Sequence, residues 1–274
     1  MSEILHMEFM RHALAAGLLV SLVCGVIGTL VVVNRIVFLA GGIAHAAYGG
    51  IGLAIFLGWP FLAGTLGVAL AAAAAMAAVT LRARHRADAV VGVIWAVGMA
   101  AGIVLIDLTP GYRSDLMSYL FGSILAVPAS ELGEMAVIAA LVVGVVAWFY
   151  PHFLAMSYDP EFARIRRVPV AALYSLMLAL IAASVVIVIR VVGLILVIAL
   201  LTIPPFIAES FSGSLKGMMA RATALSALFT VVGLFVSYGL DLTSGATIIL
   251  VAAAGFGAAL LWRRLHPARA GGAG

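Results

Sequence analysis

The stretch IVFLAGGIAHAAYGGIGLAIFLG, residues 36–58, contains one histidine and no charged residue. About 20 consecutive apolar residues in a helix span the ~30 Å hydrocarbon core of a bilayer. A helix also satisfies its own backbone hydrogen bonds, which lipid cannot do. The apolar residues run continuously, without the period-two alternation of a membrane β-strand. The stretch therefore predicts a transmembrane helix.

The same pattern recurs along the whole chain, which excludes a lone secretory signal. Hydrophobic residues make up 65% of the 274 residues and charged residues 9%, with a mean hydropathy of +1.25, whereas soluble domains carry about 25% charged residues. We predict an all-α, polytopic membrane protein of eight or nine transmembrane helices in one domain, residues 1–274. Eight remains an alternative because the seventh segment is short and ends in Pro204-Pro205. The expected spans are 12–34, 36–58, 61–81, 88–107, 131–149, 170–189, 191–208, 218–239 and 245–262.

The basic residues predict the orientation, because Lys and Arg are retained preferentially on the cytoplasmic side. If the arginine-rich turn at 82–86 lies inside, most of the 15 Lys and Arg residues fall inside with it. Arg11, Arg113 and Arg190 are the exceptions. The N-terminus is then outside and the C-terminus inside, with 264–274 as a flexible cytoplasmic tail. This distribution accounts for the pI near 9.6 without a nucleic-acid partner.

Two connections are long enough to form structure. Residues 107–130 lie outside, and Leu116, Tyr119, Leu120 and Ile124 share one helical face, which predicts a short helix at the outer interface. Residues 150–169 lie inside.

In the inner connection, Asp159 is placed to cap a short helix whose first residue is Pro160. Glu161 in the first turn and Arg164 towards its end suit the helix dipole. A solvated helix of this kind is suited to docking a cytoplasmic partner. An ordinary amphiphilic turn between two spans is the alternative.

Among the six histidines, only His45 lies well inside an apolar span. An ionisable residue within the membrane is a candidate functional residue, and imidazole is the commonest metal ligand. Tyr48 lies on the neighbouring helical face. The alternative is a neutral histidine that is hydrogen-bonded to an adjacent helix. One histidine cannot supply a three- or four-ligand site, but a symmetric dimer would bring two copies together.

Other kinds of site have little support. The single cysteine, Cys24, excludes an internal disulfide and a cysteine cluster. The sequence contains no HExxH, GxSxG or GxxxxGK motif. A membrane-embedded metalloenzyme would need at least three converging ligands, and only His45 is evident.

The chain resembles the permeases of zinc, manganese and iron ABC importers, the ABC-3 family. The resemblance is carried by ordered motifs that cover nearly the full chain. They are GTLVVVNRIVFLAGGIAHAAYGG at 28–50, DLMSYLFGSILAV at 115–127, YDPEFARIRRVPV at 158–170, VVGLILVIALLTIPPFIAESFSGSLKGMM at 191–219 and DLTSGATIILVAA at 241–253.

The resemblance implies a type II importer-like permease bundle in the inner membrane of a bacterial or archaeal cell. The partners would be a second permease copy, cytoplasmic ABC ATPase subunits and an extracytoplasmic metal-binding protein. The chain itself would be no enzyme and would hold no permanent cofactor, the cargo being Zn²⁺, Mn²⁺ or Fe²⁺. The segment resembling the coupling element would contact the ATPase through Asp159, Pro160, Glu161, Phe162 and Arg164.

This chain departs from the family at one position of the expected metal site. Family members commonly have GDALSHA here, with an aspartate four residues before the histidine, and this sequence has Gly41. A site of two histidines lacks the negative charge that offsets a divalent cation. Tyr48 and Glu209 are candidates to compensate. An ATP-independent metal channel or secondary carrier is the alternative function.

Overall fold

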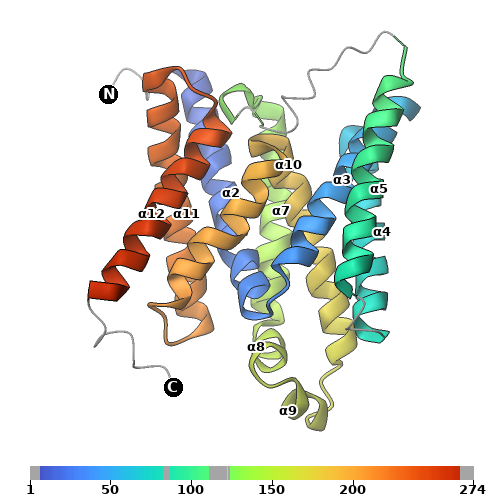
Figure 1. Ribbon diagram of the computed structural model, residues 1–274, viewed down its shortest axis with the longest axis vertical. Coiled ribbons are helices and arrows are strands. Elements are labelled where there is room, and N and C mark those ends of the chain that lie inside the picture. Colours follow the sequence, from blue (N-terminus) through green and yellow to red (C-terminus); the bar gives the residue numbers. More distant parts are fainter. Residues whose placement is uncertain (1–6, 83–86, 111–121, 123, 266–274) are drawn as a thin grey trace.

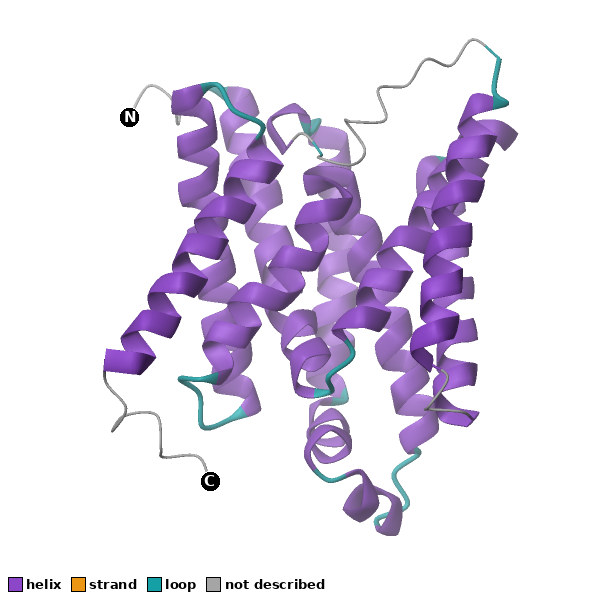
Figure 2. Cartoon of the chain, viewed as in Figure 1, coloured by secondary structure: helices purple, strands orange, loops and turns teal. Residues whose placement is uncertain are grey.

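The computed structural model describes residues 7–82, 87–110, 122 and 124–265, and all regular structure in them is helical (Figure 2). Nine helices of these segments are long and apolar enough to cross a membrane, so the all-α, polytopic prediction is confirmed. The elements are α2 (Glu8–Val33), α3 (Val37–Leu57), α4 (Phe61–Arg82), α5 (Ala87–Asp107), the 3-10 turn η2 (Ile124–Ala126), α7 (Ala129–Trp148), α8 (Tyr150–Tyr158), α9 (Pro160–Ile165), α10 (Val170–Glu209), α11 (Leu215–Leu240) and α12 (Ser244–Leu265).

Helix α10 contains two of the nine spans, Val170–Ile189 and Val192–Glu209. They are separated at Gly193, whose φ of 77° and ψ of 171° are accessible to glycine almost alone. Pro204 and Pro205 lie inside the second span, and the helix continues past them to Glu209. The described segments thus contain nine candidate spans, and the helix breaks at Gly193 and not at the prolines.

The prolines are tolerated partly through close packing by α2. Pro205 has no N–H to donate to the carbonyl of Leu201 one turn earlier. A Cβ at Gly28 would lie only 2.6 Å from that carbonyl oxygen and 2.7 Å from Pro205 Cγ. The Gly28 Cα–H therefore points at a carbonyl that lacks a donor from its own helix, an arrangement that gives a weak hydrogen bond.

Helices α3, α4 and α5 form a group of their own, here called the α3–α5 unit (Figure 1). Helix α3 packs most extensively on α5 and then on α4, whereas α2 packs mainly on α11 and α10. Although α2 and α3 are consecutive, they share few contacts. Helix α10 contacts both groups and so joins the unit to the rest of the bundle.

Glycines bring the helices of the α3–α5 unit together. A Cβ at Gly49 would lie 2.7 Å from the Gly98 carbonyl oxygen, and one at Gly50 would lie 2.6 Å from that of Gly64. Gly52 approaches the backbone of Gly102 equally closely. Such contacts are typical of membrane helices packed through small residues, and they bring the backbone of α3 directly against those of α4 and α5.

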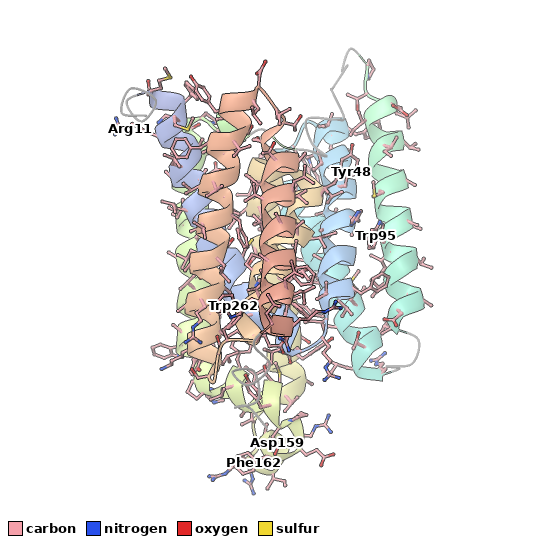
Figure 3. The ribbon with its side chains drawn as sticks, turned by 60° about the vertical axis from the view of Figure 1, so that its left-hand side comes forward. Arg11, Tyr48, Trp95, Asp159, Phe162 and Trp262 are labelled. Atoms are coloured by element: carbon pink, nitrogen blue, oxygen red, sulfur yellow. The ribbon has the colours of Figure 1, made fainter. Side chains whose placement is uncertain are left out.

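One end of the bundle is marked by α8 and α9, which project beyond the spans (Figure 1). We call it the α9 end. The turn between α2 and α3, the C-terminus of α4, the N-terminus of α11 and the C-terminus of α12 all lie there. The described basic residues at this end are Arg35, Arg82, Arg164, Arg166, Arg167, Lys216, Arg221, Arg263 and Arg264, whereas Arg11 lies at the far end (Figure 3).

Several predicted boundaries differ from those of the structure. Helix α2 begins at Glu8 and not at residue 12, and α11 begins at Leu215 because Ser214 caps it. Helix α12 continues to Leu265, inside the predicted tail, and residues 266–274 lie outside the described segments. The predicted interfacial helix also lies outside them, except for Ile124 in η2.

Candidate functional site

One ring nitrogen of His45 forms a hydrogen bond within α3, and the other ring nitrogen takes no part in that bond. Its Nδ1 lies 2.8 Å from the carbonyl oxygen of Gly41, one turn earlier in α3. A carbonyl only accepts, so in the neutral ring Nδ1 carries the proton and donates. The lone pair is then on Nε2. Metal-binding histidines are typically oriented in this way, with the second nitrogen donating to a carbonyl or carboxylate.

Trp95 of α5 covers one face of the imidazole. The two ring centroids are 3.7 Å apart and the planes are inclined by 24°. Trp95 also lies near Phe38, at 5.9 Å between centroids, and Figure 3 shows it between α3 and α5. An indole face attracts a cation, so the stack favours a cation held beside the neutral His45 ring.

Gly41 provides a backbone carbonyl and also has space for a side chain. A Cβ there would lie 3.5 Å from Trp95 Cζ3 and 3.6 Å from Ile198 Cδ1, both ordinary contacts. By contrast, a Cβ at Gly42 would lie 2.6 Å from Val91 Cγ1. A side chain at position 42 would therefore force its neighbours to move, whereas one at position 41 would not.

The two residues predicted to compensate for Gly41 lie in different surroundings. Tyr48 is 1% exposed and packs against Gly102, inside the interface between α3 and α5. Glu209 is the last residue of α10, at the α9 end. It follows Ile198, the α10 neighbour of Gly41, by about 16 Å of helix. In this conformation Glu209 does not reach His45.

Within the described segments, no three His, Cys, Asp or Glu residues are grouped so as to hold a metal ion. His45 is half-buried in the single chain. In this part of the chain, His45 offers one nitrogen, Nε2, as a candidate ligand.

The predicted capped helix is present at the α9 end. Asp159 Oδ1 accepts a hydrogen bond of 2.8 Å from the Phe162 backbone N–H, and Pro160 is the first residue of α9. The preceding residues form a further helix, α8, which was not predicted from the sequence. Pro151 stands in its first turn, where proline starts a helix as readily as it ends one.

Helix α9 has one face with exposed apolar side chains and another that lines a cavity. Phe162 is 47% exposed and Ile165 80% exposed, and the guanidinium of Arg166 lies 5.2 Å from the Phe162 ring centroid. Figure 3 shows Asp159 and Phe162 at the extreme tip of the molecule. The residues Pro160, Glu161 and Arg164 instead line a cavity of about 690 Å³ between α9 and the bundle. Of the five predicted contact residues, Phe162 is thus the one with a large exposed apolar side chain.

Five residues that contribute to these sites were not predicted from the sequence. Trp95 lies 50 positions from His45 in the chain, and nothing local marks it. The spacing of Gly98 and Gly102 is a GxxxG motif, which could have indicated a packing face of α5. Asn34 and Ser157, which are hydrogen-bonded between α2 and α8, are 123 residues apart and carry no motif.

A bundle of nine candidate spans in the described segments, with a half-buried imidazole inside and a projecting helical hairpin, is typical of a multi-pass membrane protein with a polar site between its helices. Comparison with known proteins narrows this class. The profile of the ABC 3 transport family matches residues 6–263, so the chain belongs to that family.

Several relatives cover nearly all of the chain. It is 49% identical to an uncharacterized membrane protein of Synechocystis sp., over 96% of this chain and 94% of that one. It is 32% identical to the manganese transport system membrane protein MntC of Listeria monocytogenes, over 89% and 87%. It is 30% identical to a probable iron transport system membrane protein of Haemophilus influenzae, over 96% and 97%.

A solved structure has the same fold. PsaBC from Streptococcus pneumoniae in complex with Fab matches with a TM-score of 0.87 and 26% sequence identity, covering 96% of this chain and 97% of that chain.

Proposed function

We propose that this chain is the transmembrane permease subunit of an ATP-driven importer of divalent metal ions, Zn²⁺, Mn²⁺ or Fe²⁺. The observation that carries the proposal is His45, whose Nδ1 bonds to the Gly41 carbonyl and whose Nε2 is left to bind a metal. Names of relatives that transport manganese and iron support the choice of cargo.

The projecting hairpin favours coupling to ATP over an independent channel or carrier. A capped helix with an exposed phenylalanine at its tip has the character of an interface anchor. The proposed partner there is a cytoplasmic ABC ATPase, which carries out the hydrolysis, so this chain is no enzyme. The contact residues on this chain are Asp159, Pro160, Glu161, Phe162 and Arg164.

The cluster of basic residues at the α9 end supports its assignment to the cytoplasm. The N-terminus is then outside and the C-terminus inside, in a bacterial or archaeal inner membrane. A metal-binding protein delivers the ion at the far end. A homodimer supplies a second His45, which a single chain needs to reach an adequate number of ligands.

Reconstitution in liposomes with the partner ATPase and binding protein tests the proposal, metal by metal. We expect uptake of at least one of the three ions with ATP, and none with a non-hydrolysable analogue or without the ATPase. Equal uptake with and without ATP would support the channel or carrier. Absence of uptake of all three ions would refute transport of these metals.

A further inference from the structure

The hairpin formed by α8 and α9 is tied to the corner between α2 and α3 by one side chain. Asn34 Nδ2 donates to Ser157 Oγ of α8 at 2.9 Å and to the Leu30 carbonyl oxygen of α2 at 2.8 Å. Asn34 is the C-cap of α2. The bond therefore joins the projecting hairpin to the position where the chain enters α3.

That corner is a rigid turn. The Ile36 N–H bonds to the Val31 carbonyl and the Arg35 N–H to that of Val32, both at 3.0 Å. Arg35 has a φ of 58°. This is the Schellman arrangement, in which a left-handed residue closes the helix and satisfies its last carbonyls. Ile36 and Val31 are both buried, so the turn is also packed.

Helix α3 connects this corner to His45. It begins at Val37, directly after the turn, and its glycine contacts hold its backbone directly against α4 and α5. The α3–α5 unit meets the remaining spans mainly through α10. A push on the corner therefore moves the unit, with His45 and Trp95, as one body.

Open space separates the hairpin from the α3–α5 unit. The cavity of about 690 Å³ is bounded by Arg35, Leu39 and Leu81 on one side and by Met156 and Glu161 on the other. Relative movement of the two parts across this space disrupts little apolar packing. At its other end the hairpin contacts α11, where the Lys216 ammonium lies 4.7 Å from the Tyr150 ring centroid.

We infer that the hydrogen bond between Asn34 and Ser157 is the link through which the hairpin moves the α3–α5 unit and so reorients His45. Asn34 and Ser157 are positioning residues and touch no cargo. The inference rests on the proposed function, in which an ATPase displaces the hairpin. Coupling between distant sites requires an element that both of them bias, and the α3–α5 unit is that element.

Two variants test the link in the reconstituted complex. Ser157→Ala removes the hydrogen bond to Asn34 and leaves the bond from Asn34 to the Leu30 carbonyl. Asn34→Leu removes both of these hydrogen bonds. The control is Ser175→Ala, because the Ser175 hydroxyl bonds only within α10, to the Ala171 carbonyl at 3.0 Å. Metal uptake and ATP hydrolysis are measured in the same vesicles.

We expect ions carried per ATP to fall about fivefold in Ser157→Ala, the ratio equivalent to the ~1 kcal/mol of a typical hydrogen bond. ATP hydrolysis and the Ser175→Ala ratio should stay near wild type. The double variant Asn34→Leu/Ser157→Ala should carry no fewer ions per ATP than Asn34→Leu alone, since both changes break the same interaction. An unchanged ratio would overturn the inference, and so would a parallel loss of uptake and hydrolysis, which indicates failed docking.

A measurement on the permease alone separates this inference from the proposed function. Spin labels at Ile165→Cys on α9 and Leu81→Cys on α4 report the distance across the cavity, and the only native cysteine, Cys24, is fully buried. Ser157→Ala should broaden the distance distribution relative to Ser175→Ala. An identical distribution would refute the link, whether or not the complex transports metal with ATP.

Discussion

The imidazole of His45 stacks on the indole of Trp95 with 3.7 Å between ring centroids. The stack joins α3 to α5 at the proposed metal ligand, and it covers one imidazole face while the Gly41 carbonyl accepts a hydrogen bond from Nδ1. Two neighbours thus orient the ring, and neither of them carries charge. In the proposed site, an aromatic surface lies beside the histidine, and the carboxylate that the family resemblance implies is missing.

Removal of the imidazole should abolish transport without unfolding the protein. Loss of groups that merely orient a metal ligand costs about 10- to 100-fold, so we expect His45→Ala to reduce uptake at least about tenfold. Thermal unfolding of the purified protein should stay close to wild type. His12→Ala, at the far end of α2, is the matched control. Wild-type uptake by His45→Ala would remove this residue from the path.

Trp95 should contribute to metal affinity through its ring. A cation close to an aromatic face gains about 0.5–2 kcal/mol, so Trp95→Leu should raise the KM for metal uptake by about fivefold. Trp95→Phe keeps an aromatic face and should fall between Trp95→Leu and wild type. If Phe and Leu have the same effect, Trp95 acts by filling space and not through its π surface.

Position 41 should accept a side chain, whereas position 52 should not. A Cβ at Gly41 makes ordinary contacts, so Gly41→Ala should leave the thermal unfolding temperature unchanged or slightly raised. Gly52→Ala forces a Cβ against the Gly102 backbone and should destabilise the protein by about 1–3 kcal/mol.

The variant Gly41→Asp tests whether a carboxylate strengthens metal binding at the proposed site. It places a negative charge one helical turn before His45, and we expect more metal to remain bound after washing with a chelator than in Gly41→Ala. Equal retention in the two variants would show that the missing carboxylate does not limit binding.

The cap of α9 should matter for binding to the ATPase. Asp159→Ala removes the acceptor for the Phe162 N–H and should cost about 1 kcal/mol of helix stability, equivalent to about fivefold weaker binding. Asp159→Asn keeps a side-chain oxygen and should bind like wild type. The measurement is the affinity of the purified permease for its ATPase. Equal loss in both variants would indicate that the charge, and not the cap, is recognised.

The spans, the Asp159 cap and His45 were predictable because each depends on local sequence. Hydropathy identifies an apolar helix within about 20 residues, and a cap needs only Asp159, Pro160 and the next turn. Prolines are less informative locally. Pro151 lies in the first turn of α8, whereas Pro204 and Pro205 lie within a continuous span, because neighbouring helices can compensate for a missing N–H.

The partners of these local features could not be predicted from sequence. Trp95 meets His45, and Ser157 meets Asn34, only after the helices have packed, and neither pair has a characteristic spacing. Nothing in the sequence around the glycines of α3 reveals that α5 is the helix that packs against Gly49 and Gly52. The same is true of Tyr48. Helical periodicity places it on the face next to that of His45, but in the packed structure its side chain lies in the interface between α3 and α5.

The turn at Arg35 also sets how deep His45 lies in the bilayer. Arg35 and Trp59 flank α3, and residues of these types favour the two membrane surfaces. At 1.5 Å per residue, His45 lies about 15 Å from Arg35 and about 21 Å from Trp59, close to the midplane of a core that is ~30 Å thick. In the proposed orientation, a divalent ion at this depth has crossed about half of the membrane potential. With two charges, that gain is about 2.3 kcal/mol at 100 mV. The resting potential of the cell would thus oppose the ion's return to the outside before any ATP is hydrolysed.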